Sequence, residues 1–322
     1  MPRIAAAMTG VFAALVVFAD ALAQNYPARA VRVVVAYPAG GANDFHARLV
    51  AQKLTEAMGQ QFVVENRAGA GGNLGFEHVA RAVPDGYTLL MGAGSMTVAP
   101  SLYAKLGFDV LKDFAPISTV ATVQNVTMLH PSVPARTVKE LIALARAQPG
   151  RLNYASSGIG ATPHLSAELL KTMAGIDIVH IPYKGDTPAY ADLLGGQVDM
   201  MVSVIAGGIG HIRAGKLRAI SVTGRKRTSV LPDVPTMHEA GLAGYEIESW
   251  FGLIAPAGTS REIVTTLNTQ VARAVASADV RERFANAGSE AASNTPEQFA
   301  ELMRANVTKF ARIVKAAGAK LD

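Results

Sequence analysis

Short hydrophobic segments rich in valine and isoleucine alternate with longer amphipathic segments along most of the chain. The short segments have the length and composition of strands in a parallel sheet whose two faces are both covered. The longer segments carry apolar residues on one helical face, as Phe45, Leu49 and Leu54 do. The alternation predicts a doubly wound α/β protein with strands at 31–36, 61–65, 87–91, 152–155, 176–181, 198–202 and 217–222.

Four threonines mark expected helix starts. Thr137 and Thr259 are each followed three residues later by glutamate, which is the pattern of a capping box. Thr162 and Thr295 each precede a proline, which is favoured at the first position of a helix. We therefore expect each of these hydroxyl groups to cap a helix that begins at the next residue.

Two long extended segments, 114–130 and 245–256, interrupt the alternation. A chain needs such a pair to pass from one lobe to a second lobe and to return. The length of 322 residues also favours two lobes, because a domain commonly holds roughly 150 residues. We predict one lobe formed by residues 24–124 and 250–322 and a second formed by residues 125–249, with a ligand cleft between them.

The first 23 residues have the features of a secretory signal peptide. Arg3 precedes an apolar run at 11–18, and Ala21-Leu22-Ala23 matches a cleavage site. The run is far shorter than the roughly 20 residues that span a bilayer, which argues against a membrane anchor. We expect the mature protein to begin near Gln24 and to be exported, for example into a bacterial periplasm.

Composition narrows the chemistry that the protein can carry. The chain has no cysteine, which excludes disulfides, thiolate metal sites and a cysteine nucleophile. Its net charge is +5, but the only dense basic run is Arg225-Lys226-Arg227, and aromatic residues make up 6% of the chain. Nucleic acid is therefore not expected as a partner. The sequence has no long heptad run of the kind that would indicate an obligate dimer, so we expect a monomer.

Two glycine-rich turns between a strand and a helix are the candidate binding sites. The first covers 37–44 and contains Gly40 and Gly41, and the second covers 154–162 and contains two serines and two glycines. A helix start offers unpaired N–H groups and a partial positive charge, which together bind an anion. Either turn alone is equally consistent with an ordinary connection, but one falls in each predicted lobe.

Nucleotide, hydrolase and metal chemistry lack their sequence signatures. The G-x-G stretches at 69–71, 92–94 and 158–160 have no third glycine at the required spacing, and neither a P-loop, nor G-x-S-x-G, nor H-E-x-x-H occurs. The seven histidines are scattered singly. Ser157 and His164 can be imagined as nucleophile and base, but nothing in the sequence orients the imidazole. We expect no cofactor, no bound metal and no catalysis.

Several long motifs resemble those of the Bug (TctC-like) solute-binding proteins of tripartite tricarboxylate transporters. They include P-A-G-G-A-N-D from Pro38, V-E-N-R-A-G-A-G-G-N-L-G from Val64 and P-D-G-Y-T-L-L from Pro84, and further motifs continue to 255–259. The resemblance implies a two-lobed, type II (Venus-flytrap) periplasmic binding protein, with a doubly wound sheet in each lobe and two crossover strands. It also implies that a small carboxylate is bound and delivered to a membrane permease. A periplasmic sensor that presents its liganded form to a signalling partner is the alternative.

The resemblance further implies that the two turns bind the carboxylate, partly through ordered water. Asp44 has two readings, a structural helix cap or an acceptor for a ligand hydroxyl or ammonium group. Where relatives often have an acidic group, this chain has Ser203, which favours an organic acid such as a dicarboxylate over an amino acid and leaves aromatic carboxylates open. Tyr37 and Trp250 are candidates for the pocket wall. The expected ligand-binding residues are Tyr37, Ala39, Gly40, Gly41, Asp44, Ser95, Thr97, Ser156, Ser157, Gly158, Thr162, Asp186 and Ser203.

Overall fold

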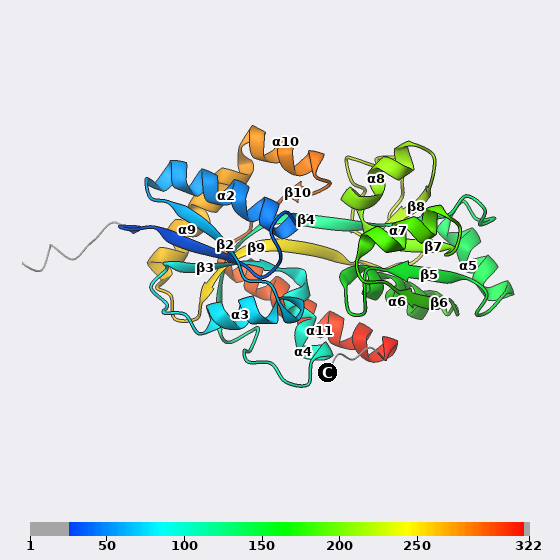
Figure 1. Cartoon of the computed structure of the whole chain (residues 1–322), viewed down its shortest axis with the longest axis horizontal. Coiled ribbons are helices and arrows are strands. Elements are labelled where there is room, and N and C mark those ends of the chain that lie inside the picture. The colour runs from blue at the N-terminus through cyan, green and yellow to red at the C-terminus, as the bar shows by residue number, and fades with distance from the viewer. Residues whose placement is uncertain (1–25, 319–322) are drawn as a thin grey trace, which may run out of the picture.

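The computed structural model describes residues 26–318 as two α/β lobes joined by two long strands (Figure 1). The predicted signal peptide, residues 1–23, lies outside the described residues. The strands are β1 (Val31–Val35), β2 (Phe62–Asn66), β3 (Thr88–Ala93), β4 (Phe114–Leu129), β5 (Asn153–Ser156), β6 (Val179–Pro182), β7 (Met200–Val204), β8 (Arg218–Val222), β9 (Glu248–Pro256) and β10 (Glu290–Ala291).

Helices cover both faces of the sheet, which confirms the predicted α/β class. The α-helices are α2 (Ala42–Met58), α3 (Asn73–Ala80), α4 (Ala99–Leu102), α5 (Val138–Ala147), α6 (Thr162–Ala174), α7 (Asp186–Leu194), α8 (Ile205–Arg213), α9 (Arg261–Ala276), α10 (Ala278–Asn286) and α11 (Pro296–Ala317). Two short 3₁₀ segments are η2 (Ala70–Gly72) and η3 (Gly94–Thr97).

The seven short strands expected from the hydrophobic pattern are all present, with small differences in their bounds. The largest difference concerns β6, which begins at Val179 rather than at Ile176. The amide of Ile176 donates to the carbonyl of Lys171 at 3.2 Å and so closes the end of α6. Pairing with β5 then starts at Val179, opposite Asn153.

The two longest strands carry the chain between the lobes, as the sequence predicts. In the first lobe β1 pairs in parallel with β2 and β3, and in the second lobe β5 pairs in parallel with β6 and β7. The strand β4 is antiparallel to β9 as far as Gln124, opposite Glu248, and antiparallel to β7 from Asn125, opposite Val204. The result is one continuous sheet with the order β2-β1-β3-β9-β4-β7-β5-β6.

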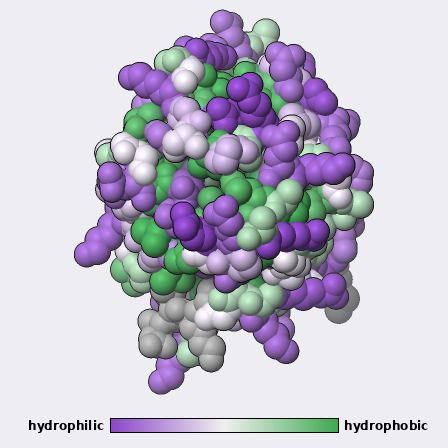
Figure 2. Space-filling model, turned by 90° about the vertical axis from the view of Figure 1, so that its right-hand side faces the viewer, coloured by the Kyte–Doolittle hydropathy of each residue, from purple (hydrophilic) through white to green (hydrophobic). Residues whose placement is uncertain are grey.

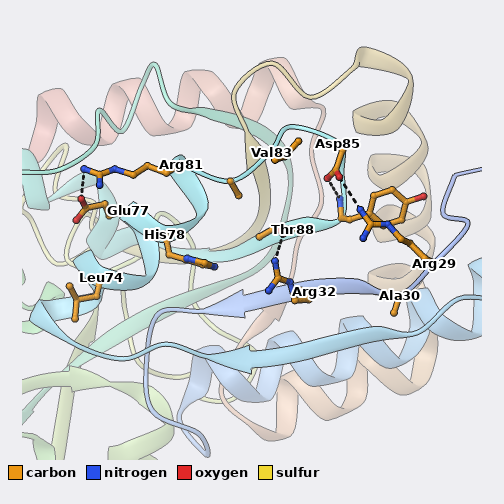
Figure 3. A pocket seen from close by; sticks show the side chains of 12 residues that line it. Arg29, Ala30, Arg32, Leu74, Glu77, His78, Arg81, Val83, Asp85 and Thr88 are labelled. Atoms are coloured by element: carbon orange, nitrogen blue, oxygen red, sulfur yellow. Dashed lines mark hydrogen bonds and ion pairs between the residues drawn. The ribbon is translucent and has the colours of Figure 1, made fainter.

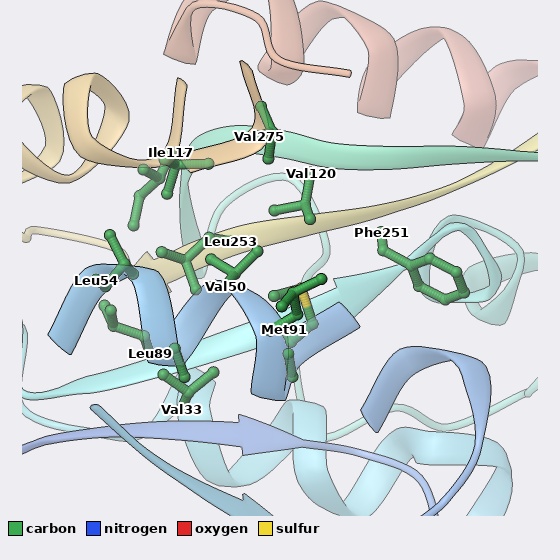
Figure 4. Packing of buried hydrophobic residues seen from close by; sticks show 14 of the residues in the cluster. Val33, Val50, Leu54, Leu89, Met91, Ile117, Val120, Phe251, Leu253 and Val275 are labelled. Carbon is green, nitrogen blue, oxygen red and sulfur yellow. The ribbon is translucent and has the colours of Figure 1, made fainter. Parts of the chain in front are cut away.

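The core of the first lobe lies on both faces of this sheet. On one face Val33 and Met91 pack against α2 and α9 (Figure 4). On the other face Val34 packs near α3 and α11, together with Trp250, whose ring makes an edge contact with Phe299 at 4.9 Å between centroids. Each fully buried side chain of this kind contributes about 1.5–3 kcal/mol. Trp250 is 2% exposed and therefore belongs to the core rather than to a pocket wall.

Two of the four expected helix caps are present. Thr137 accepts a hydrogen bond from the Glu140 amide, and Thr295 forms a full capping box with Gln298. The expectation was wrong for α9, where Ser260 caps the helix because the Thr259 hydroxyl donates to the Pro256 carbonyl at 2.8 Å. It was also wrong for α6, where Thr162 is already the first helical residue.

Candidate ligand-binding site

The predicted site residues gather at the carboxyl ends of the parallel strands, which is where ligands bind in open α/β sheets. The turn after β1 contains residues 36–41 and leads into α2, and the loop after β3 contains Ser95 and Thr97. In the second lobe, β5, β6 and β7 lead into α6, α7 and α8. The amino end of α2 lies on the side of the first lobe that faces the second lobe (Figure 1).

Asp44 holds the first turn in place. Its Oδ2 accepts hydrogen bonds from the Gly40 amide and from Arg48 Nε, both at 2.9 Å, and its Oδ1 accepts from Asn66 Nδ2 at 2.9 Å. Burial alone would raise its pKa, but the hydrogen bonds from Arg48, Gly40 and Asn66 lower it to about 2. The side chain is 5% exposed. These contacts fit the structural reading of Asp44, although Gly41, not Asp44, is the capping residue of α2.

The first backbone amides of α2 have no hydrogen-bond partner within the helix. Ala42 and Asn43 therefore supply donors at this turn, next to the exposed Gly41. The amide of Gly40 is occupied by Asp44, in contrast to the expectation that it is free for a ligand. Gly40 has a φ of 83°, a conformation that favours glycine.

The other predicted residues of the first lobe contact the protein itself. Tyr37 Oη and Ser95 Oγ share a hydrogen bond, and burial raises the pKa of Tyr37 to about 12. The Thr97 hydroxyl donates to the Gly94 carbonyl at 2.6 Å and is fully buried. Ala39 is exposed beside Gly40. Thus Tyr37 and Ser95 lie together at the carboxyl ends of β1 and β3, whereas Thr97 holds its own loop.

Two histidines hold the turn of the second lobe. Ser156 Oγ lies 2.7 Å from His180 Nε2 and 3.3 Å from the Gly158 amide, and Ser156 is fully buried. The Gly160 amide donates to His164 Nδ1 at 3.1 Å, and the two imidazole rings stack at 4.2 Å. Ser156 and the Gly158 amide therefore hold the turn itself, in contrast to the expectation that both are free for a ligand.

Burial disfavours the charged form of both histidines. Burial lowers the pKa of His164, and burial together with the neighbouring His164 lowers the pKa of His180 to about 4. Because His164 Nδ1 accepts a hydrogen bond, its proton is on Nε2. The sequence shows these histidines only as separate residues. They meet because α6 and β6 both lie next to β5.

A second group forms where β6 and β7 end. Ser203 Oγ donates to Asp186 Oδ1 at 3.4 Å, and the Ser157 hydroxyl lies close to Asp186. Desolvation raises the pKa of Asp186, and the two hydroxyl groups oppose this effect. Tyr190, which is not among the residues expected from the sequence, lies one helical turn beyond Asp186 in α7. This spacing places both residues on one face of the helix. Ser157, the serine considered as a nucleophile, lies near Asp186, and His164 Nδ1 instead accepts from the Gly160 amide.

Thr162 and Ile159 border the turn of the second lobe. Thr162 is partly buried, and its carbonyl accepts from the Ser166 hydroxyl at 2.8 Å. Ile159 is 45% exposed. Figure 2 shows that hydrophilic side chains cover most of the end of the second lobe, with hydrophobic residues visible between them. An exposed isoleucine inside a polar turn offers apolar contact to a carbon chain.

A hollow of about 880 Å³ lies at the opposite edge of the first lobe (Figure 3). It is lined by residues at the amino ends of β1 and β3 and by α3. Its cations have partners, since Arg29 pairs with Asp85 at 3.0 Å and Arg81 pairs with Glu77 at 2.5 Å. This hollow is therefore neither part of the two turns nor an open cation site.

Within residues 26–318, no group of three or more histidine, aspartate and glutamate side chains is arranged to hold a metal ion. Over the same residues, no helix combines the length and hydrophobicity that a membrane crossing requires. What the site offers is backbone amides from the first lobe, and hydroxyl groups and one carboxylate from the second. Such groups bind a small polar molecule by hydrogen bonds and dipoles.

Comparison with known proteins relates the chain to transport receptors. Residues 46–319 match the family described as "Tripartite tricarboxylate transporter family receptor" (TctC). BugT of Bordetella pertussis is 37% identical over 318 residues, which are 98% of each chain. The structure of Rpa4515 of R. palustris with adipate is 38% identical with a TM-score of 0.79, covering 92% of this chain and 100% of that one.

MatC of Rhodopseudomonas palustris, solved with bound malate, is 34% identical with a TM-score of 0.74, covering 90% of this chain and 100% of that one. The fold is that of a two-lobed solute-binding protein. The chain belongs to the TctC family of tripartite tricarboxylate transporter receptors, as the motifs predict.

Proposed function

We propose that the protein is a periplasmic receptor that captures a small carboxylate between its lobes and delivers it to a permease of the tripartite tricarboxylate type. The observation that carries this proposal is the pair of turns, one from each lobe, that present donors at strand ends. It is supported by relatives whose structures hold adipate and malate. Both are dicarboxylates, which agrees with the expected class of organic acid.

The proposed contacts divide the predicted residues into two groups. Gly41 with the first amides of α2 and the Ser157 hydroxyl bind the carboxylate, because Gly41 and Ala42 are exposed and Ser157 is half-buried in the turn of the second lobe. Ala39 and Thr162 border it, and Asp186, to which Ser203 donates, faces the rest of the ligand. The residues whose groups are occupied within the protein position the turns, and these are Tyr37, Gly40, Asp44, Ser95, Thr97, Ser156 and Gly158.

We propose residues 24–124 with 250–322 and residues 125–249 as the two moving bodies. The change of partner along β4 supports this division, because pairing with β9 ends at Gln124 and pairing with β7 begins at Asn125. Hinges in such proteins are a few residues where the chain crosses between lobes. Bending there brings the two turns together around the ligand.

Thermal unfolding with a panel of mono-, di- and tricarboxylates, amino acids and aromatic acids tests the receptor function. A ligand at 100 times its dissociation constant stabilises the protein by about 2.7 kcal/mol, which raises the midpoint by several degrees. Ser157→Ala should reduce this shift, whereas Ser293→Ala, an exposed serine outside the site, should leave it unchanged. Delivery is tested by co-purification with the permease.

A protein stripped of bound ligand by unfolding and refolding is the starting point of this experiment. A shift confined to one class of carboxylate supports the receptor function. If no carboxylate shifts the midpoint, or if Ser157→Ala binds as the wild type does, the assignment of the ligand or of the turn is refuted. Turnover of the ligand would refute the receptor function itself.

A further inference from the structure

Asp186 has no cationic partner in the part of the chain that the structure describes. It is the first residue of α7, where its negative charge interacts favourably with the partial positive charge of the helix start. The Ser203 hydroxyl donates to Asp186 at 3.4 Å, and the Ser157 hydroxyl lies nearby. A distance of 3.4 Å is long for a bond between two oxygen atoms. The carboxylate therefore keeps acceptor capacity for a further donor.

Tyr190 carries a buried hydroxyl group without a partner among the described residues. The residue is 7% exposed, and its hydroxyl lies next to Ser203 and within the influence of the Asp186 charge. A Cβ atom on Gly207 or Gly208 would come within about 3.0–3.1 Å of this oxygen. The two glycines at the start of α8 therefore leave room for it. A buried polar group without a partner is costly, so an oxygen supplied by a ligand would stabilise it.

The chemistry of these two groups selects among ligand substituents. A hydroxyl group donates one hydrogen bond and accepts others, so it satisfies Asp186 and Tyr190 together. An ammonium group only donates, so it can bond to Asp186 and to the Tyr190 oxygen but leaves the Tyr190 hydroxyl hydrogen without an acceptor. A second carboxylate only accepts and is repelled by Asp186. A hydrocarbon chain satisfies neither.

We propose that Asp186, Ser203 and Tyr190 form a subsite for a hydroxyl group, so that the ligand is a hydroxy acid. The hydroxyl hydrogen is donated to Asp186, and the hydroxyl oxygen accepts from Tyr190. Ser203 keeps the Asp186 carboxylate in position. This inference rests on the proposed function, because the two turns hold the carboxylate of the same ligand.

Calorimetric titration with matched acids tests the subsite. The acid that gives the largest shift in the thermal panel is compared with its hydroxyl, ammonium and unsubstituted counterparts. Malate, aspartate and succinate are the set with four carbon atoms. A hydrogen bond to a charged group corresponds to about a ten- to hundredfold difference in the dissociation constant. We expect the hydroxy acid to bind more tightly than both counterparts by a factor in this range.

Asp186→Asn and Tyr190→Phe should each reduce this preference to less than about fivefold while binding of the unsubstituted acid persists. Asp177→Asn is the matched control, because Asp177 is an exposed acid before β6, at the other end of that strand. Ligand-free thermal midpoints check that each variant is folded.

The outcomes separate this inference from the proposed function. Equal binding of the hydroxy acid and the unsubstituted acid, a preference that persists in Asp186→Asn, or tightest binding of the amino acid overturns the hydroxyl subsite while the carboxylate receptor stands. Absence of binding by every carboxylate overturns both.

Discussion

Replacing Asp44 by asparagine keeps the size of the side chain but removes the charge on which three donors converge. The Gly40 amide, Arg48 and Asn66 all donate to this carboxylate at 2.9 Å. An amide has one oxygen and one NH₂ group, so at least one of the three donors would face another donor. The substitution therefore disrupts the contacts that hold the first turn, and its effect can be measured as stability.

The expected size follows from the pKa of Asp44, which falls from an ordinary 3.8 to about 2. This difference corresponds to about 2.4 kcal/mol of stability at neutral pH. The Arg48 side chain is 54% exposed, so solvent screens part of the attraction. We expect Asp44→Asn to lower the free energy of unfolding by about 1–2 kcal/mol at pH 7. Because the folded pKa lies below the unfolded one, this stabilisation is present above pH 3.8 and is lost as the pH falls towards 2.

Urea unfolding of the wild type and Asp44→Asn at pH 7 and at pH 2.5 to 3 measures both the size and the pH dependence. Asp279→Asn is the control, because the Asp279 side chain, which pairs with Lys53 at 2.8 Å, is 49% exposed, and ion pairs of exposed carboxylates contribute little. Equal stability of the wild type and Asp44→Asn at pH 7 would refute the reasoning. So would a difference of the same size at both pH values, because the carboxylate charge would then not be its source.

Two further predictions concern the turn of the second lobe. In Gly160→Ala, where φ is +80°, the added Cβ would lie 2.3 Å from Leu102 Cδ1. We expect this variant to be destabilised by about 1–3 kcal/mol more than Gly175→Ala, where φ is +59° and nothing lies within 4 Å of the added Cβ. Equal urea midpoints of the two variants would contradict the clash. Because the pKa of His180 is lowered to about 4, the unfolded state binds more protons between pH 6.5 and 4, and stability falls as the pH decreases through this range. The slope should be smaller in His180→Gln, and equal slopes of the unfolding free energy against pH would show that His180 is not the group responsible.

Most of the fold can be predicted because each strand is a separate hydrophobic run and the two crossover strands are unusually long. The bounds of β6 could not, since the amide of Ile176 is used to end the preceding helix. The capping-box pattern also misplaces the cap of α9. The Thr259 hydroxyl donates to the Pro256 carbonyl, and the hydroxyl of the next residue, Ser260, caps the helix.

The candidate turns could be predicted for a similar local reason, because glycines and hydroxyl groups stand between a strand and a helix. Their supporting residues are a different matter. Arg48 lies four residues after Asp44 on the same helix, a spacing that signals a contact. Asn66 reaches Asp44 only because β2 pairs with β1, and His180 reaches His164 only because both pack beside β5. Such contacts depend on tertiary structure, which a local pattern does not contain.

The pairing of β9 with β3 and β4 has a consequence for the order in which the protein matures. Contacts such as that between Ala93 and Phe251 join the early part of the chain to a strand that leaves the ribosome much later. The segment from β5 to β8 is contiguous and meets its partners during synthesis, whereas the sheet of the first lobe stays incomplete until β9 emerges. Non-local pairing of this kind is slow. The export predicted from residues 1–23 would therefore act on a chain whose first lobe stays unfinished, and so open to translocation, until its synthesis is nearly complete.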